Sequence, residues 1–124
     1  MGDGSFCLIV SDTFDVQDLY VLTLRTQRIR AVSVGGHDDA ILVIRCMPVA
    51  AVLYDVERLP GWESLAAFRR EIQSSIPIVV VSSGLTAGRS YRLLARQLGC
   101  AAFIARPCSP FYRGAGDAAR RQRR

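Results

Sequence analysis

The stretch VAAVLYD, residues 49–55, places six apolar residues directly before a carboxylate, Asp55. A buried strand explains the apolar run, but a carboxylate at its end is costly unless it emerges at a surface pocket. Three other apolar runs also finish in polar residues, which are Ser11-Asp12, Ser82-Ser83 and Arg106. If these runs are neighbouring parallel strands, one edge of the sheet gathers groups that suit a divalent cation and a phosphoryl group.

Length and composition predict one domain with a single buried core. The chain has 124 residues, and half of them are apolar, which suits one core with buried strands. No apolar stretch approaches the roughly 20 residues that cross a bilayer. The N-terminus MGDGSFCLIV lacks the basic region of a signal peptide. We therefore expect a cytoplasmic protein without a membrane segment.

The basic charge belongs to one end of the chain. The formal net charge is +5, yet residues 113–124 hold five arginines against one aspartate. Residues 1–112 hold eleven arginines and ten acids and are near neutral. We therefore expect a domain over residues 1–112 and a flexible basic tail over 113–124, and we do not expect the chain to bind nucleic acid.

Cysteine and histidine give no metal or redox motif. The four cysteines show no C-x-x-C spacing, and His37 is the single histidine, in a turn-like GGHDD segment. Zinc sites need clustered ligands. We expect buried free thiols and a solvated His37.

The chain alternates between strand and helix patterns. The strand candidates are 6–11, 29–34, 49–54, 77–82 and 101–105. All but 29–34 are continuous apolar runs typical of buried parallel strands, whereas 29–34 alternates as an edge strand does. The pattern predicts a flavodoxin-like α/β fold, a five-stranded parallel sheet in the order 2-1-3-4-5 with helices on both faces. Ligands of such sheets bind at the carboxyl ends of strands 1 and 3, where Asp12 and Asp55 lie.

Apolar stripes at helical spacing fill the gaps between the strands. One stripe contains Val16, Leu19, Tyr20 and Thr23, and similar stripes follow in 40–47, 65–72 and 91–98. We attribute all of them to core packing and none to a binding face.

Four segments, in order, resemble the receiver domain of two-component response regulators, over residues 6 to about 110. They are LIVSD (8–12), VLYD (52–55) with LPGWESL (59–65), IPIVVVSS (76–83) and LGCAAFIARPCSP (98–110). The resemblance implies a signalling module rather than an enzyme. It implies a sensor histidine kinase or phosphotransfer protein as phosphodonor and a downstream protein as target. Because no effector domain follows in this sequence, we expect output through protein contacts.

The resemblance also assigns roles to residues that match the family's motifs. Asp55 matches the phosphoacceptor. Asp12, Asp55 and the backbone carbonyl of Glu57 match the positions that hold Mg²⁺, whose task is to neutralise charge as the phosphoryl group approaches. The phosphate-contacting and switch positions are matched by Ser82, Phe103 and Arg106.

Three departures from the family pattern keep a second hypothesis open. Ser11 stands where the first acid of the acidic pair is expected, which weakens the predicted Mg²⁺ site. Arg106 replaces a lysine and could pair with Asp55 as a bidentate fork. One extra residue separates Asp55 from Pro60. The alternative is therefore a pseudo-receiver, a protein-interaction module that works without phosphorylation. A third hypothesis, an unrelated flavodoxin-like enzyme, has no supporting motif in the sequence.

The last segment differs most from the family. Receivers finish with an amphipathic fifth helix, but here Gly114 and Gly116 weaken helix formation and no large apolar residue follows Tyr112. We expect a short fifth helix or none, with residues 114–124 poorly packed. Apolar residues left exposed on helix 4 and strand 5 would then favour a partner or a homodimer through that face.

Overall fold

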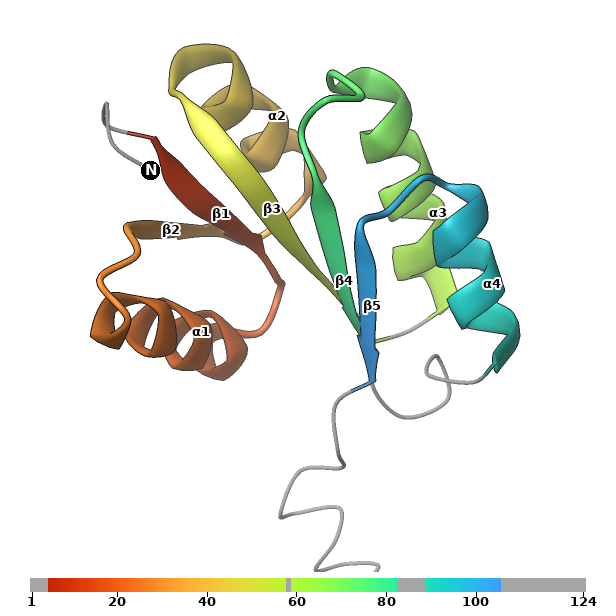
Figure 1. The fold of residues 1–124 in the computed structure, drawn as a ribbon, viewed down its shortest axis with the longest axis horizontal. Helices are drawn as coiled ribbons and strands as arrows, with labels where there is room; N and C mark the ends of the chain where they lie inside the picture. The colour runs from red at the N-terminus through yellow and green to blue at the C-terminus, as the bar shows by residue number, and fades with distance from the viewer. Residues whose placement is uncertain (1–4, 58, 83–88, 106–124) are drawn as a thin grey trace, which may run out of the picture.

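A computed structural model describes residues 5–57, 59–82 and 89–105 (Figure 1). Strands and helices alternate along this part of the chain. The elements are β1 (Phe6–Val10), α1 (Phe14–Thr26), β2 (Ala31–Val34), α2 (His37–Cys46), β3 (Val49–Val56), α3 (Leu59–Glu71), β4 (Ile78–Ser82), α4 (Arg89–Gln97) and β5 (Ala102–Ala105). All strand pairs are parallel, in the order β2-β1-β3-β4-β5. The predicted fold and strand order are confirmed.

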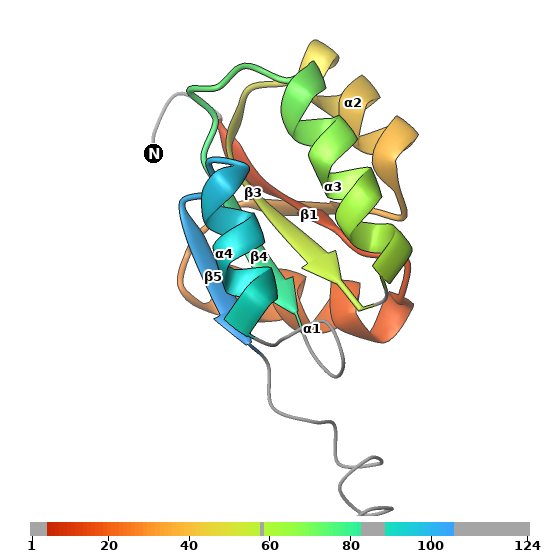
Figure 2. The same ribbon diagram turned by 90° about the vertical axis from the view of Figure 1, so that its right-hand side faces the viewer.

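The helices are divided unequally between the two faces of the sheet. Helices α2, α3 and α4 lie on one face, and α1 lies on the other (Figure 2). The hydrophobic core fills the space between the sheet and the group of three helices. Its fully buried members include Leu8, Val52, Leu65, Phe68 and Val80, and each such side chain contributes about 1.5–3 kcal/mol when removed from water.

The entry into β2 differs from the expectation. Residues 29 and 30 were predicted as strand, but β2 begins at Ala31. The N–H of Ile29 donates to the Leu24 carbonyl and that of Arg28 to the Arg25 carbonyl, which is the Schellman arrangement at a helix C-terminus. Arg28 accordingly has φ 63°, a left-handed conformation usually left to glycine. Closing α1 therefore uses Ile29, whereas the Arg30 carbonyl already accepts from the Cys7 N–H of β1 at 2.9 Å.

The core interpretation of the first helical stripe is wrong in part. Val16 is 7% exposed, as predicted, but Leu19 is 55% exposed. Thr23 is also exposed. Helix α1 lies over β1 and β2 at one side of the sheet, so only a narrow strip of its surface contacts the strands.

A buried glutamine fixes α1 on the sheet. Gln17 is 8% exposed, and its Nε2 donates to the Ser11 carbonyl at 2.6 Å and the Val34 carbonyl at 3.3 Å. Its Oε1 accepts from the Ser33 hydroxyl at 3.2 Å. The side chain thus joins α1 to the ends of both β1 and β2, and it satisfies polar groups that would otherwise be costly to bury.

The thiols follow the expectation only in part. Cys7 and Cys100 are half-buried, and burial raises the pKa of both thiols. For Cys100, the positive charge of Arg69 opposes this effect and lowers the pKa, but burial is the larger cause. Cys46, at the end of α2, is exposed, so the prediction of a buried thiol is wrong there. No helix within the described ranges is long and apolar enough to cross a membrane.

We predict that Gln17→Ala lowers the free energy of unfolding by about 1–3 kcal/mol, because it removes the amide that donates to the buried Ser11 carbonyl, whereas the Val34 carbonyl keeps the Ser11 N–H. Gln97→Ala, at an exposed position that ends α4, should change it by less than about 0.5 kcal/mol. Urea unfolding followed by circular dichroism measures both. Equal stability of the two variants would show that the Gln17 bonds do not anchor α1.

Candidate functional site

Parallel register brings the strand ends to one edge of the sheet. Val10 lies opposite Tyr54, and Ser82 lies opposite both Val56 and Ala105. The carboxyl ends of β3, β4 and β5 are therefore level, and β1 ends opposite Tyr54, just before them. A pocket of about 310 Å³ opens at this edge beside β1 and β3, and its polar lining includes Ser11, Asp12, Asp55 and Glu57.

Asp55 lies one residue inside its strand rather than after it. β3 runs from Val49 to Val56, two residues beyond the predicted end, and Asp55 pairs in register with Val81. The alternation of β3 sends Tyr54 and Val56 into the core and Asp55 to the opposite side. Its carboxylate therefore emerges on the face that carries α1.

Ser11 contacts the candidate acceptor directly. Its hydroxyl donates to Oδ2 of Asp55 at 2.9 Å, while the N–H of Thr13 donates to the same hydroxyl at 3.2 Å. Ser11 is 2% exposed, so water competes little for this bond. The sequence indicated only a lost negative charge at Ser11; the structure shows a hydroxyl that donates to the Asp55 carboxylate.

The predicted Mg²⁺ ligands offer oxygen atoms alone. Asp12, Asp55 and Glu57 line the same pocket, and Asp12 accepts a long hydrogen bond, 3.3 Å, from the Thr13 hydroxyl. Within the described residues, no three His, Cys, Asp or Glu side chains are grouped so as to hold a metal ion. Mg²⁺ commonly uses one or two carboxylates and keeps several waters. The residues present therefore fit a hydrated Mg²⁺ and do not form a closed cage.

The two switch positions lie on the core side of the sheet. Ser82 ends β4 and is fully buried. Phe103 of β5 stacks on Trp62 of α3, with ring centroids 6.1 Å apart, and the Arg92 guanidinium lies 5.0 Å above its ring. Trp62 also stacks on Tyr91 of α4 at 5.5 Å. Phe103 thus belongs to an aromatic stack that joins β5, α3 and α4.

Three residues of the pocket wall were not predicted. Tyr54 and Ser64 share a hydrogen bond of 2.7 Å between their hydroxyl groups. Burial raises the pKa of Tyr54, and the hydrogen bond to Ser64 opposes part of this increase. His37 was expected to be solvated, but it begins α2 with its Nε2 3.4 Å from the Glu71 carboxylate and its ring edge-on to Phe68. The GGHDD pattern gave no sign of these contacts because both partners are distant in sequence.

Gly61 explains how α3 approaches the site closely. A Cβ atom at Gly61 would lie 3.1 Å from Cγ1 of Val56, so a larger residue would require this side chain or the start of α3 to move by a few tenths of an ångström. The pair Pro60-Gly61 is part of the first turn of α3, where proline is well tolerated.

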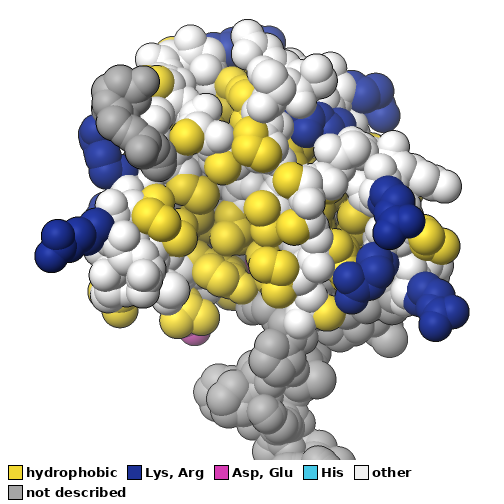
Figure 3. Space-filling model, in the orientation of Figure 1, with side chains coloured by type: hydrophobic (Ala, Val, Ile, Leu, Met, Phe, Trp, Pro, Cys, Tyr) yellow, Lys and Arg dark blue, Asp and Glu magenta, His cyan; other side chains and the backbone are white. Residues whose placement is uncertain are grey.

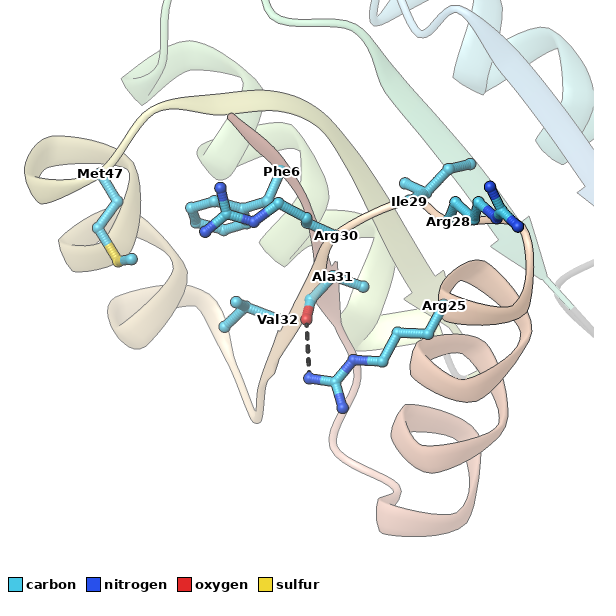
Figure 4. Close-up of a pocket in the computed structure, with 8 residues that line it drawn as sticks. All are labelled: Phe6, Arg25, Arg28, Ile29, Arg30, Ala31, Val32 and Met47. Atoms are coloured by element: carbon cyan, nitrogen blue, oxygen red, sulfur yellow. Dashed lines mark hydrogen bonds between the residues drawn. The ribbon is translucent and has the colours of Figure 1, made fainter. Parts of the chain in front are cut away.

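A second hollow lies at the opposite end of the sheet. It measures about 460 Å³ and lies around the start of β2, with Arg25, Arg30, Val32 and Met47 in its wall (Figure 4). Arg25 donates to the Ala31 carbonyl at 3.5 Å, which covers part of this edge strand. This hollow is larger, but no residue predicted for the site lines it, and ligands of such sheets bind at the carboxyl ends of the strands.

Several predicted features lie outside the described residues. They are Arg106, the fifth helix and the tail over 113–124.

Comparisons with known proteins give structural matches only. No protein-family model and no curated protein matches the sequence. A solved response regulator receiver protein from Pseudomonas putida superposes with a TM-score of 0.74 at 19% identity, over 96% of this chain and 99% of that one. A receiver protein from Burkholderia phymatum gives 0.69 at 23% identity, over 91% and 93%.

A longer protein contains the same fold as one part. The NtrX structure from Brucella abortus matches with a TM-score of 0.70 at 20% identity, over 97% of this chain but 28% of that one. The matches cover nearly all of this chain and agree with the order of the four sequence segments. The chain therefore has the fold of a response regulator receiver domain.

Proposed function

We propose that this chain is a receiver domain that accepts a phosphoryl group on Asp55 from a histidine kinase or a phosphotransfer protein. The observation that carries the proposal is the position of Asp55, which shares a 310 Å³ pocket with Asp12 and Glu57 at the carboxyl edge of the sheet. The phosphorylated domain would then change its contacts with a downstream protein. It acts as a signalling module rather than as an enzyme.

The transfer requires an anionic, positioned carboxylate. One oxygen of Asp55 attacks phosphorus, the P–N bond to the donor histidine breaks, and the imidazole nitrogen keeps the electron pair. The Ser11 hydroxyl holds Oδ2, which orients the carboxylate and makes Oδ1 the oxygen that Ser11 does not engage. Bound Mg²⁺ would supply charge neutralisation for this step, held by Asp12, Asp55 and the carbonyl of Glu57.

The signal would pass through the aromatic stack. Ser82 would donate to a phosphoryl oxygen, and the resulting shift at the end of β4 would bias the packing of Phe103 between Trp62 and Arg92. The indole N–H of Trp62 is buried without a hydrogen bond to any described residue, which costs about 1–3 kcal/mol. An alternative packing that gives the Trp62 N–H a hydrogen-bond acceptor would therefore be close in free energy to the resting packing.

We predict that acetyl phosphate and Mg²⁺ phosphorylate Asp55, as measured by intact-protein and peptide mass spectrometry. Asp12→Asn should slow labelling by about tenfold or more, because it removes a carboxylate from the metal position. Asp39→Asn, an equally exposed aspartate at the start of α2, is the matched control and should label normally. Absence of labelling at Asp55 in the wild type would favour the pseudo-receiver function instead.

We predict that Ser11→Asp increases the labelling rate several-fold, about two- to tenfold, because it restores negative charge at the metal position. Ser11→Ala removes the hydrogen bond that orients Asp55 without adding charge and should slow labelling by about two- to tenfold. An equal rise in both variants would mean that the Ser11 bond itself restrains the acceptor.

Arg106→Lys tests the residue that the resemblance assigns to phosphate contact. We predict that this variant is labelled faster, because a lysine keeps the charge and cannot form a bidentate pair with a carboxylate. The measurement is the same mass-spectrometric assay, with Asp55→Asn as the blank. Slower labelling would make Arg106 a working phosphate ligand and would contradict an inhibitory pair.

Trp62 is the single tryptophan of the chain, so its fluorescence reports on the stack alone. We predict that phosphorylation changes the Trp62 emission because the Phe103 ring stacks on it. The change should be absent in Asp55→Asn and reduced in Phe103→Leu. Labelling without any spectral change would separate phosphorylation from the proposed movement of Phe103.

A further inference from the structure

The hollow around the start of β2 lies apart from the candidate acceptor pocket. It measures about 460 Å³ and opens at the amino ends of β1 and β2, between the end of α1 and the end of α2 (Figure 4). Asp55 lies at the opposite edge of the sheet. A hollow of this size falls within the range of small-molecule sites, about 300–1,000 Å³. A ligand bound here would therefore be distinct from any phosphoryl group on Asp55.

Apolar side chains form the floor of this hollow. Phe6 is 2% exposed and therefore belongs to the buried interior, whereas Val32 and Met47 are 36% and 45% exposed. Leu8 pairs in register with Val32, so Phe6 and Val32 point to the same face of the sheet, the face that carries α2. An apolar group bound on this face would remove Val32 and Met47 from water, which is favourable. Figure 3 shows that most arginine side chains in its view lie around the apolar areas rather than within them.

Three arginines border the apolar floor. They are Arg25 in α1, Arg28 just after α1 and Arg30 just before β2, and all are exposed. None of them forms a salt bridge with another described residue. Arg25 donates to the Ala31 carbonyl at 3.5 Å, a long hydrogen bond that uses one of its five N–H donors. The border thus offers guanidinium groups that are not neutralised by a described carboxylate.

The charge balance at the hollow favours an anion. The C-terminal ends of α1 and α2 lie beside it, and each carries the equivalent of about half a negative charge. Three guanidinium groups outweigh this contribution. They repel a cation and bind carboxylate or phosphate oxygens, often as bidentate pairs. An inorganic anion, however, would leave the apolar floor in water, so the ligand that uses the whole hollow also has an apolar part.

We propose that this hollow binds a small organic anion, a carboxylate or phosphate group carried on an apolar body. The apolar body would lie on Phe6, Val32 and Met47. In Figure 4 the Arg30 side chain lies beside Phe6, and Arg25 reaches from α1 toward the start of β2. Arg30 would therefore bond the anionic head, while the charges of Arg25 and Arg28 raise the positive potential around it.

The N-terminus of the chain itself is the competing occupant. Residues 1–4 directly precede Ser5 and contain one acid, Asp3, which is close in sequence to Phe6. If the Asp3 carboxylate fills the hollow, an added anion would bind only after that carboxylate is removed. The variant Asp3→Asn therefore separates an occupant from this chain from an external ligand.

Decanoate, a carboxylate on an unbranched alkyl chain, is the probe. A ¹H–¹⁵N NMR titration of the full chain, up to about 5 mM, should shift the amide signals of residues 29–32 and 47 with a dissociation constant of about 1 mM or below. Acetate lacks the apolar body and decyltrimethylammonium has the opposite charge, so each should bind at least about tenfold more weakly. Arg30→Gln should weaken decanoate binding about fivefold or more, because it removes a charge-assisted hydrogen bond.

Arg96→Gln is the matched control. Arg96 is also exposed but lies on α4, away from the hollow, so this variant should bind decanoate as the wild type does. Met47→Glu places a carboxylate on the apolar floor and should abolish binding. It provides a second disruption in case Arg30→Gln does not fold, which circular dichroism would reveal.

Four results would overturn the proposal. The first is a wild type that does not bind decanoate in this range, and the second is binding that appears only in Asp3→Asn. The third is an equal loss of affinity in Arg96→Gln and Arg30→Gln, or signal shifts spread over the whole domain, since both indicate non-specific binding. The fourth is binding to vesicles of anionic lipid without binding of monomeric decanoate, which would assign the hollow to a membrane surface instead.

Discussion

Parallel pairing of β1 with β3 is the constraint on which the rest of the structure depends. It places Val10 opposite Tyr54, so that the residues after them, Ser11 and Asp55, emerge side by side and form a hydrogen bond of 2.9 Å. Neither residue could reach the other if the strands slipped by one position, since a one-residue slip sends every side chain to the opposite face. Burial of Leu8 and Val52 in the core enforces the register. The hydrophobic core therefore determines the geometry of the candidate site.

The fold was predictable from sequence because its signals are local and repeated. Four apolar runs and the alternating edge strand predicted a parallel sheet, and right-handed crossovers left only a few topologies, among them the order 2-1-3-4-5. Boundaries were less predictable. The run that ends at Tyr54 suggested a strand end, yet β3 continues through Asp55 to Val56, because backbone pairing with β4 does not depend on whether a side chain is apolar.

The polar contacts of the site were the least predictable part. Ser11 was interpreted as a missing charge, and its bond to Asp55 joins residues 44 positions apart. Gln17 lies in a helix for which only the apolar residues were analysed from the sequence. Its side chain nevertheless connects Ser11, Ser33 and Val34. His37 contacts Glu71 and Phe68 across two helices. Such contacts arise only once the register and the helix positions are set, and no spacing within one segment encodes them.

The candidate site and the switch positions lie on opposite faces of the sheet. Ser11 and Asp55 belong to the side of the sheet that carries α1, and the same alternation sends Leu53 and Ala51 to that side. The switch positions, in contrast, point into the core, where Phe103 stacks on Trp62. Phe103 and Ile104 are adjacent in β5 and point to opposite faces. A shift of β5 that repacks Phe103 would therefore also move Ile104, so a change at the switch positions would reach the opposite face of the sheet.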